Sequence, residues 1–296
     1  APVVVQRPVR VSLEPPFGVP IGLAVSYEQQ RGHAVYASEP VDLDLTGTVC
    51  LVTGSTGGIG LESARLLAAE GAAVVTSGRR DEPPGVGESL HLAADLGRAG
   101  EPERLVREVE EKLGRVDCLV NNVGLAVQRS FGEVTDEQWD ELWQLNVMSY
   151  VRAIRAVLPG MRGRREGVIV NVSSTAGKRP SASMPDYSVT KAAVLSLSRL
   201  IADVYAKDGI RCNAITPGPT ATEAWLGEGG LADQQAARTG KTKDEVIAAV
   251  GAGRPLGRLA EPGEIASVIA FLCSPRSAYV TGAAWSADGG TVPIIV

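Results

Sequence analysis

Cysteine and histidine are scarce in this chain, which narrows the chemistry open to it. The 296 residues include two histidines and four cysteines, namely His33, His91, Cys50, Cys118, Cys212 and Cys273. The cysteines are far apart in sequence and form no C-x-x-C pair, so neither a disulfide framework nor a zinc site is expected. We interpret them as reduced thiols buried in the core.

Long apolar runs and an excess of basic residues are also missing. No run is long enough to span a bilayer, and the N-terminus lacks the basic-then-apolar order of a signal peptide. The formal net charge is -5, which leaves no electrostatic footprint for nucleic acid. With 44% hydrophobic and 21% charged residues, we expect a cytoplasmic globular protein that binds neither nucleic acid nor membranes.

The first 44 residues differ from the rest of the chain. Six prolines interrupt any helix there, yet the segment carries too many apolar residues for a typical disordered tail. Two interpretations stay open: an arm laid over the domain or a neighbouring subunit, and a loosely ordered leader with no role. A regular pattern begins near residue 45, which predicts a single catalytic domain over residues 45–296.

Within that domain, short apolar segments alternate with amphipathic ones. The predicted strands are 49–52, 73–77, 91–96, 117–124, 167–172, 210–215 and 282–286. The predicted helices are about 61–70, 102–113, 136–158, 187–206 and 262–272. This order predicts an α/β fold: a doubly wound parallel (Rossmann) sheet of about seven strands, with helices on both faces and the ligand at the strands' carboxyl ends. The Gly- and charge-rich stretch near 218–258 has the composition of an active-site lid.

A glycine-rich turn joins the first strand to the first helix. It reads Thr53-Gly54-Ser55-Thr56-Gly57-Gly58-Ile59-Gly60. Gly54 permits a tight turn, whereas Gly58 and Gly60 let backbone and helix approach a pyrophosphate at the positive end of the helix. This turn therefore predicts a dinucleotide site, with Thr56 and Ile59 also contacting the cofactor.

The second strand ends in Gly78-Arg79-Arg80. A carboxylate there would bind the ribose hydroxyls of NAD, whereas two guanidinium groups suit a 2′-phosphate. We therefore predict NADP, with NAD possible and two merely solvated arginines as the alternative. Asp95 and Leu96 end the third strand, where Asp95 is placed to accept from the adenine amino group.

Tyr187 and Lys191 are four residues apart, so they share one face of a predicted helix. A phenol keeps its proton to pH ~10, and a neighbouring ammonium favours the phenolate. The pair could thus exchange a proton at a carbon–oxygen bond; the alternative is a surface aromatic beside a surface charge. Asn146 lies inside the long predicted helix, where asparagine is unfavourable unless its side chain has a task.

Taken together and in order, these motifs resemble the short-chain dehydrogenase/reductase family over about residues 45–290. The motifs are Thr53-Gly54-x-x-x-Gly58-Ile59-Gly60, Asn121-Asn122-x-Gly124, Asn146, Ser174, Tyr187-x-x-x-Lys191 and Pro217-Gly218. The downstream segments Gly257-Arg258-x-x-x-Pro262-x-Glu264-Ile265-Ala266 and Asp288-Gly289-Gly290 are similar to the ketoacyl-reductase-like branch.

The resemblance implies a role for each catalytic residue. Tyr187 matches the acid/base. Lys191 matches the lysine that lowers the phenol pKa and binds the nicotinamide ribose. Ser174 lies thirteen positions before the tyrosine and is followed by x-x-Gly, so it matches the carbonyl-polarising serine, with Ser173 as a structural neighbour. Asn146 matches the asparagine whose backbone carbonyl holds a water leading to the lysine.

The resemblance also implies cofactor contacts. Asn121 matches a residue that braces the strand-four turn, and Gly124 lets that turn pack closely. The remaining implied contacts are Asn122, Tyr187, Lys191, Pro217, Gly218, Thr220 and Thr222. Gly57 occupies a position where many NADP-dependent members carry a basic residue, so the prediction of NADP depends on Arg79 and Arg80 alone.

The resulting prediction is an NADP(H)-dependent ketoreductase that transfers hydride to a ketone or aldehyde, with Tyr187 as general acid. An NAD-dependent secondary-alcohol dehydrogenase and a non-catalytic dinucleotide-binding regulator are the alternatives. The substrate is expected to be a small carbonyl or alcohol, in a pocket lined by residues 128–131, 178–185 and 222–226 with Met184, Trp225 and Leu226 as an apolar wall. The resemblance further implies a homodimer or homotetramer.

Overall fold

The computed structural model describes residues 42–293. Of the predicted N-terminal arm, residues 1–41 lie outside the described part of the chain. The predictions for that segment are therefore not developed further.

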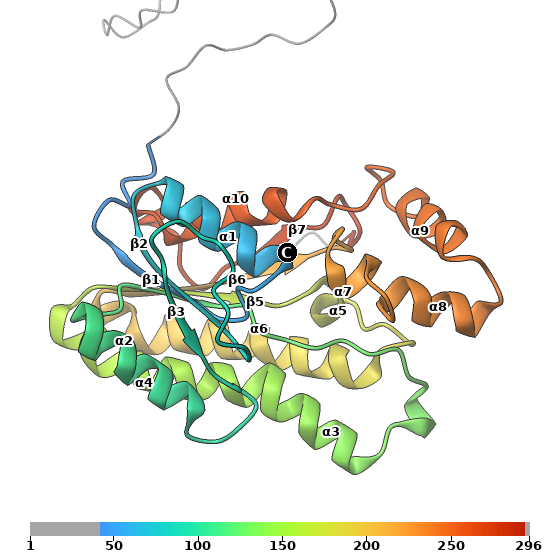
Figure 1. Cartoon of the computed structure of the whole chain (residues 1–296), viewed down its shortest axis with the longest axis horizontal. Helices are drawn as coiled ribbons and strands as arrows, with labels where there is room; N and C mark the ends of the chain where they lie inside the picture. The colour runs from blue at the N-terminus through green and yellow to red at the C-terminus, as the bar shows by residue number, and fades with distance from the viewer. Residues whose placement is uncertain (1–41, 294–296) are drawn as a thin grey trace, which may run out of the picture. The chain divides into compact units, whose positions relative to one another are not determined.

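Seven strands form one parallel sheet in the order β3-β2-β1-β4-β5-β6-β7 (Figure 1). The strands are β1 (Val49–Val52), β2 (Ala73–Gly78), β3 (Leu90–Ala93), β4 (Cys118–Asn121), β5 (Gly167–Val172), β6 (Ile210–Pro217) and β7 (Ala284–Ala287). The chain winds outward from β1 to β3 and then crosses back to β4. This reversal opens a crevice at the carboxyl ends of β1 and β4, where such sheets bind ligands. The predicted fold class is confirmed.

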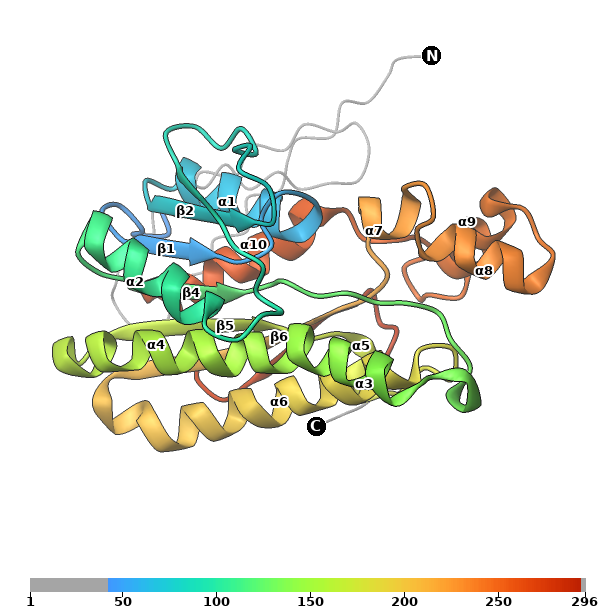
Figure 2. The same ribbon diagram turned by 60° about the horizontal axis from the view of Figure 1, so that its bottom comes forward.

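Helices cover both faces of the sheet because its strands are apolar on both sides. In β1, Val49 and Leu51 belong to one core cluster, and Cys50 and Val52 belong to the other. The first cluster packs against α2 (Glu101–Leu113), α4 (Ser149–Arg164) and α6 (Pro185–Tyr205), and the second against α1 (Gly58–Ala69) and α10 (Pro262–Cys273) (Figure 2).

The predicted helix over residues 136–158 differs from the structure in two ways. It consists of α3 (Asp136–Trp143), a π-helical turn at Gln144–Met148, and α4. The π turn contains Asn146, whose buried amide is used in contacts outside the helix. The helix also continues to Arg164, past the exposed Pro159, where the prediction ended it at residue 158.

Strand ends and the predicted lid also differ in detail. β3 ends at Ala93, so Asp95 and Leu96 follow the strand rather than belong to it, and β4 ends at Asn121. The 218–258 stretch carries α7 (Glu223–Leu226), α8 (Leu231–Thr239) and α9 (Lys243–Ala252). The remaining short elements are α5 (Thr175–Lys178) and the 3-10 turns η1 (Phe131–Glu133), η3 (Ala206–Asp208) and η4 (Pro275–Ser277).

Candidate active site

The glycine-rich turn after β1 has no room for a side chain at Gly54 or at Gly60. Gly54 has φ +61, and a Cβ there would lie 2.8 Å from Val123 Cα. A Cβ on Gly60 would lie 2.4 Å from Asn122 Nδ2. Gly58, with φ +54, is the first residue of α1. The turn thus presents bare backbone at a helix N-terminus, which fits the pyrophosphate of a dinucleotide.

Asn122, the residue directly after β4, braces this turn. Its Nδ2 donates to Thr53 O at 3.0 Å and to Gly54 O at 2.9 Å, and its backbone N–H donates to Thr53 Oγ1 at 2.9 Å. Asn121, which the resemblance matched to a residue that braces the turn after strand four, points across the sheet and donates to Asn171 Oδ1 at 2.9 Å. Side chains alternate along a strand, so neighbouring asparagines face different partners.

Arg79 and Arg80 are exposed at the end of β2, where they line the hollow that contains the glycine turn. Their segment is held by His91, whose ring hydrogen-bonds Thr76 Oγ1 at 2.9 Å and Arg80 O at 2.8 Å. The sequence indicated only that His91 belongs to a strand. A Cβ on Gly78 would lie 2.4 Å from Thr56 Cγ2, so this position leaves no room for a ribose-binding carboxylate.

Asp95 and Leu96 both line this hollow, but their side chains have different surroundings. The Asp95 carboxylate pairs with Arg98 Nε at 3.1 Å, and both side chains are exposed. The Leu96 side chain is buried in the core, so any polar contact with a ligand must use its backbone. Arg98 was not singled out from the sequence.

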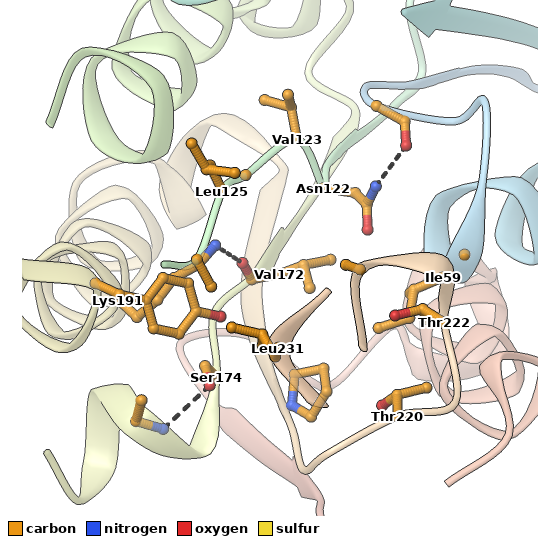
Figure 3. Close-up of a pocket in the computed structure, with 18 of the residues that line it drawn as sticks. Ile59, Asn122, Val123, Leu125, Val172, Ser174, Lys191, Thr220, Thr222 and Leu231 are labelled. Atoms are coloured by element: carbon orange, nitrogen blue, oxygen red, sulfur yellow. Dashed lines mark hydrogen bonds between the residues drawn. The ribbon is translucent and has the colours of Figure 1, made fainter. Parts of the chain in front are cut away.

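Lys191 is buried in the wall of the hollow, beside the carboxyl end of β5. Its Nζ donates to Val172 O at 2.8 Å (Figure 3). The same Nζ lies 5.7 Å from the centre of the Tyr187 ring and 5.3 Å from that of Tyr150. The side chain is 3% exposed, so the amine has little contact with water.

Tyr150 is a residue that sequence reasoning missed. It is fully buried, and its hydroxyl donates to Val123 O at 3.0 Å and Val172 O at 3.2 Å. It therefore links the loop after β4 to the end of β5 under the lysine. The available signal was its i, i+4 spacing from Asn146, which puts both on one side of the helix.

Burial governs the two titrating groups at the site. It lowers the pKa of Lys191 to about 7. It raises the pKa of Tyr187, and the nearby Ser174 side chain acts in the opposite direction. The expectation that an ammonium lowers the phenol pKa gave too little weight to desolvation, which acts against the charged forms of both groups.

Ser174 and Ser173 have different partners. Ser174 is the N-cap of α5, where its Oγ accepts from Ala176 N at 3.1 Å (Figure 3). Accepting this bond leaves its own hydrogen available for donation. Ser173 Oγ instead donates to Lys191 O at 2.7 Å. A Cβ on Gly177 would lie 2.7 Å from that same carbonyl, so glycine lets α5 approach α6.

The Asn146 amide holds the loop after β4 against α6. Its Oδ1 accepts from Leu125 N at 2.9 Å, and its Nδ2 donates to Leu125 O at 2.9 Å and Thr190 Oγ1 at 3.2 Å. A Cβ on Gly124 would be 3.3 Å from both Asn146 Oδ1 and Lys191 Nζ. Asn146 and Gly124 therefore lie beside the lysine.

The loop after β6 closes the crevice from the other side. Thr220 is buried, and its Oγ1 donates to Gly218 O at 2.9 Å. A Cβ on Gly58 would lie 3.1 Å from Thr222 Cγ2, so this loop touches the glycine turn. Pro217, Gly218, Thr220 and Thr222 all line the hollow.

These groups surround one hollow of about 1320 Å³. That volume exceeds the usual ~300–1,000 Å³ of a small-ligand pocket and suits a dinucleotide together with a substrate. Its lining also includes Gln128, Arg179, Met184, Trp225 and Leu231. Seven residues that were expected in the pocket are not among the lining residues: Arg129, Ser130, Phe131, Lys178, Ala182, Pro185 and Leu226.

Residues 42–293 contain neither a metal-binding cluster of side chains nor a membrane-spanning helix. No group of three or more His, Cys, Asp or Glu side chains in this range is arranged to hold a metal ion. None of the helices in the same range is both long enough and apolar enough to cross a membrane.

Comparison with known proteins agrees with this geometry. A family profile described as Enoyl-(Acyl carrier protein) reductase matches residues 54–292. The chain belongs to the short-chain dehydrogenase/reductase family. It is therefore an NAD(P)-dependent oxidoreductase, and its relatives include the ketoreductase-like branch of that family.

The relatives match nearly their full length. An uncharacterized oxidoreductase of Bacillus subtilis, YvrD, is 36% identical over 85% of this chain and 99% of its own. The 3-oxoacyl-[acyl-carrier-protein] reductase FabG of Vibrio cholerae is 33% identical over 84% and 98%. Among solved structures, L-sorbose reductase from Gluconobacter frateurii, complexed with NADPH and L-sorbose, is 34% identical in sequence to this chain. The match covers 86% of this chain and 100% of the reductase chain, with a TM-score of 0.80.

Proposed function

We propose that this chain is an NADPH-dependent ketoreductase, with Ser174, Tyr187 and Lys191 acting on the carbonyl of a small-molecule substrate. One observation carries the proposal. Lys191 Nζ lies 5.7 Å from the centre of the Tyr187 ring, and Tyr187, Lys191 and Ser174 line one crevice that also contains the glycine turn.

NADPH is the cofactor that the adenosine end of the crevice supports best. Arg79 and Arg80 supply two guanidinium groups, and Thr56 packs where a ribose-binding carboxylate on residue 78 would project. The L-sorbose reductase relative was crystallised with NADPH. When bound, NADPH supplies the hydride for the carbonyl carbon.

The chain's own residues then act on the carbonyl oxygen. The free hydrogen of Ser174 is available for donation to that oxygen as negative charge builds, a contact worth ~3 kcal/mol in other enzymes. The raised pKa keeps Tyr187 protonated, so it can give its proton to the oxygen. Lys191, in its charged form, stabilises the phenolate left behind. The loop that Asn146 holds keeps Lys191 in place.

A turnover assay tests this function. The purified protein is mixed with NADPH or NADH and a panel of 3-oxoesters, diketones and ketoses, and nucleotide oxidation is followed by absorbance. We expect reduction of at least one carbonyl class, with kcat/KM at least about tenfold higher for NADPH than for NADH. A protein that binds NADPH tightly yet reduces none of the panel would favour the regulator alternative.

A homodimer or homotetramer is also proposed. Its support is a set of exposed apolar side chains on α3 and α6: Trp143, Val189, Leu200 and Val204. Sedimentation at micromolar concentration should give two or four times the chain mass, and a monomer would contradict it. Cytoplasmic location stays a prediction.

A further inference from the structure

A buried ion pair lies directly beside the residue to which we assign proton transfer. Asp186 is the second residue of α6, and its side chain is completely inaccessible to solvent. Its Oδ1 accepts from the backbone N–H of Tyr187 at 2.8 Å, and its Oδ2 accepts from Arg129 at 2.8 Å. That N–H belongs to the first turn of α6, where no carbonyl of the helix can accept it.

Arg129 contacts both the first turn of α6 and the chain just before it. Besides the ion pair, its backbone N–H donates to Ser183 O at 2.9 Å. Its side chain is 18% exposed, so the pair is largely shielded from water. A buried carboxylate needs such a partner, because an uncompensated charge is strongly disfavoured there.

The neighbours of Arg129 are bound by α8, on the other side of the pocket. Gln128 N donates to Gln234 Oε1 at 2.9 Å, and Arg238 donates to Ser130 Oγ at 2.9 Å. Leu231, the first residue of α8, lines the same pocket as Ser174 and Lys191 (Figure 3). Residues 128–130 thus connect α8 to the N-terminus of α6.

We propose that Arg129 is a positioning residue for carbonyl reduction. Through Asp186 it fixes the backbone of Tyr187 and hence the phenol, and through Gln128 and Ser130 it couples the docking of α8 to that position. The inference deepens the proposed function and rests on it. When α8 packs against residues 128–130, the Tyr187 phenol is therefore brought into position at the same time.

Four variants test this proposal with the best carbonyl of the panel: Arg129→Met, Arg129→Lys, the double variant Arg129→Met/Asp186→Asn, and the control Arg162→Met. Arg162 forms a more exposed 2.8 Å pair with Asp208, away from the pocket. We expect Arg129→Met to lower kcat by about 10- to 100-fold, as small misplacements do, with the Kd for NADPH unchanged. Arg129→Lys should be intermediate, since an ammonium keeps the charge but not the guanidinium geometry. Arg162→Met should match wild type.

The double variant separates positioning from stability. It removes the unpaired carboxylate, so the melting temperature lost in Arg129→Met should return while kcat stays low. Recovery of kcat together with stability would assign Arg129 a purely structural role and overturn the proposal. So would a kcat for Arg129→Met within about twofold of wild type. If Arg129→Met alone does not fold, the double variant and Arg129→Lys still decide the matter.

Coupling to α8 is tested by adding Arg238→Met. This change should lower kcat/KM in the wild-type background and have little further effect in the Arg129→Met background, whereas additive losses would contradict the coupling.

Hydrogen exchange tests the positioning role of Arg129 without any substrate. Peptides covering residues 184–191 should exchange faster in Arg129→Met than in Arg162→Met, and equal rates would overturn the positioning role. If the wild-type protein shows no turnover, the proposed function is contradicted, whereas the positioning role of Arg129 is still decided by hydrogen exchange.

Discussion

Lys191 Nζ donates to Val172 O at 2.8 Å and lies 5.7 Å from the centre of the Tyr187 ring. The lysine is therefore held by the sheet rather than by the phenol. Val172 O also accepts a hydrogen bond from the Tyr150 hydroxyl, so Lys191 Nζ and Tyr150 share one acceptor. The amine thus has a fixed position over the rings of Tyr150 and Tyr187. Its burial means that its charge changes near neutral pH.

The first prediction concerns stability and Lys191. The folded pKa of about 7 lies below the ordinary lysine value of 10.5, so between these pH values the unfolded chain binds more protons than the folded one. Stability therefore rises with pH in this window. Relative to Lys191→Met, the free energy of unfolding of wild type should increase by on the order of 1–3 kcal/mol from pH 7 to 10. Urea titrations at both pH values measure it, and a constant difference would show that Lys191 keeps an ordinary pKa.

The pH dependence of turnover has the same origin. The ammonium form of Lys191 stabilises the phenolate left after reduction, so kcat for reduction should fall as pH rises through about 7. Initial rates at saturating NADPH and carbonyl, from pH 5 to 9, measure it. A rate that rises over this range would assign the proton chemistry to another group.

The glycine turn offers a matched pair of substitutions. A Cβ on Gly60 would lie 2.4 Å from Asn122 Nδ2, whereas a Cβ on Gly57 meets nothing within 4 Å. Gly60→Ala should displace the brace, lower stability by about 1–3 kcal/mol and weaken NADPH binding. Gly57→Ala should resemble wild type in both. NADPH fluorescence titration and thermal melting compare them, and equal behaviour would contradict the proposed contact.

Cofactor choice is predicted to depend on Arg79 and Arg80. Replacing both with serine should raise the KM for NADPH by about 10-fold or more and leave that for NADH nearly unchanged, because only NADPH carries the 2′-phosphate. Gly78→Asp alone should impair both cofactors, since its Cβ would lie 2.4 Å from Thr56 Cγ2. Combining it with Thr56→Gly should recover NADH. Unaltered KM for NADPH in the double serine variant would remove the basis for NADP.

Much of the fold was predictable because its signals are local. β1, the glycine turn and α1 are adjacent in sequence, and the apolar strands alternate with amphipathic helices. The spacing of Tyr187 and Lys191 likewise needs only helical geometry. These features depend on neighbours a few residues apart, which a single sequence displays.

What the sequence did not reveal depends on distant partners. The π turn at Asn146 follows from its bonds to Leu125, and the role of Asn122 from bonds across the sheet. His91, Tyr150 and the Arg129–Asp186 pair are brought to the site by tertiary packing. The low pKa of Lys191 reflects burial, which no spacing rule supplies.

The most direct test of the account is the turnover of Tyr187→Phe, measured beside its Kd for NADPH. The variant keeps the ring but has no proton to give, so kcat for carbonyl reduction should fall by about 10²- to 10⁴-fold, while NADPH binds as in wild type. A variant that binds NADPH normally and reduces the carbonyl near the wild-type rate would contradict the assignment of Tyr187 as the acid.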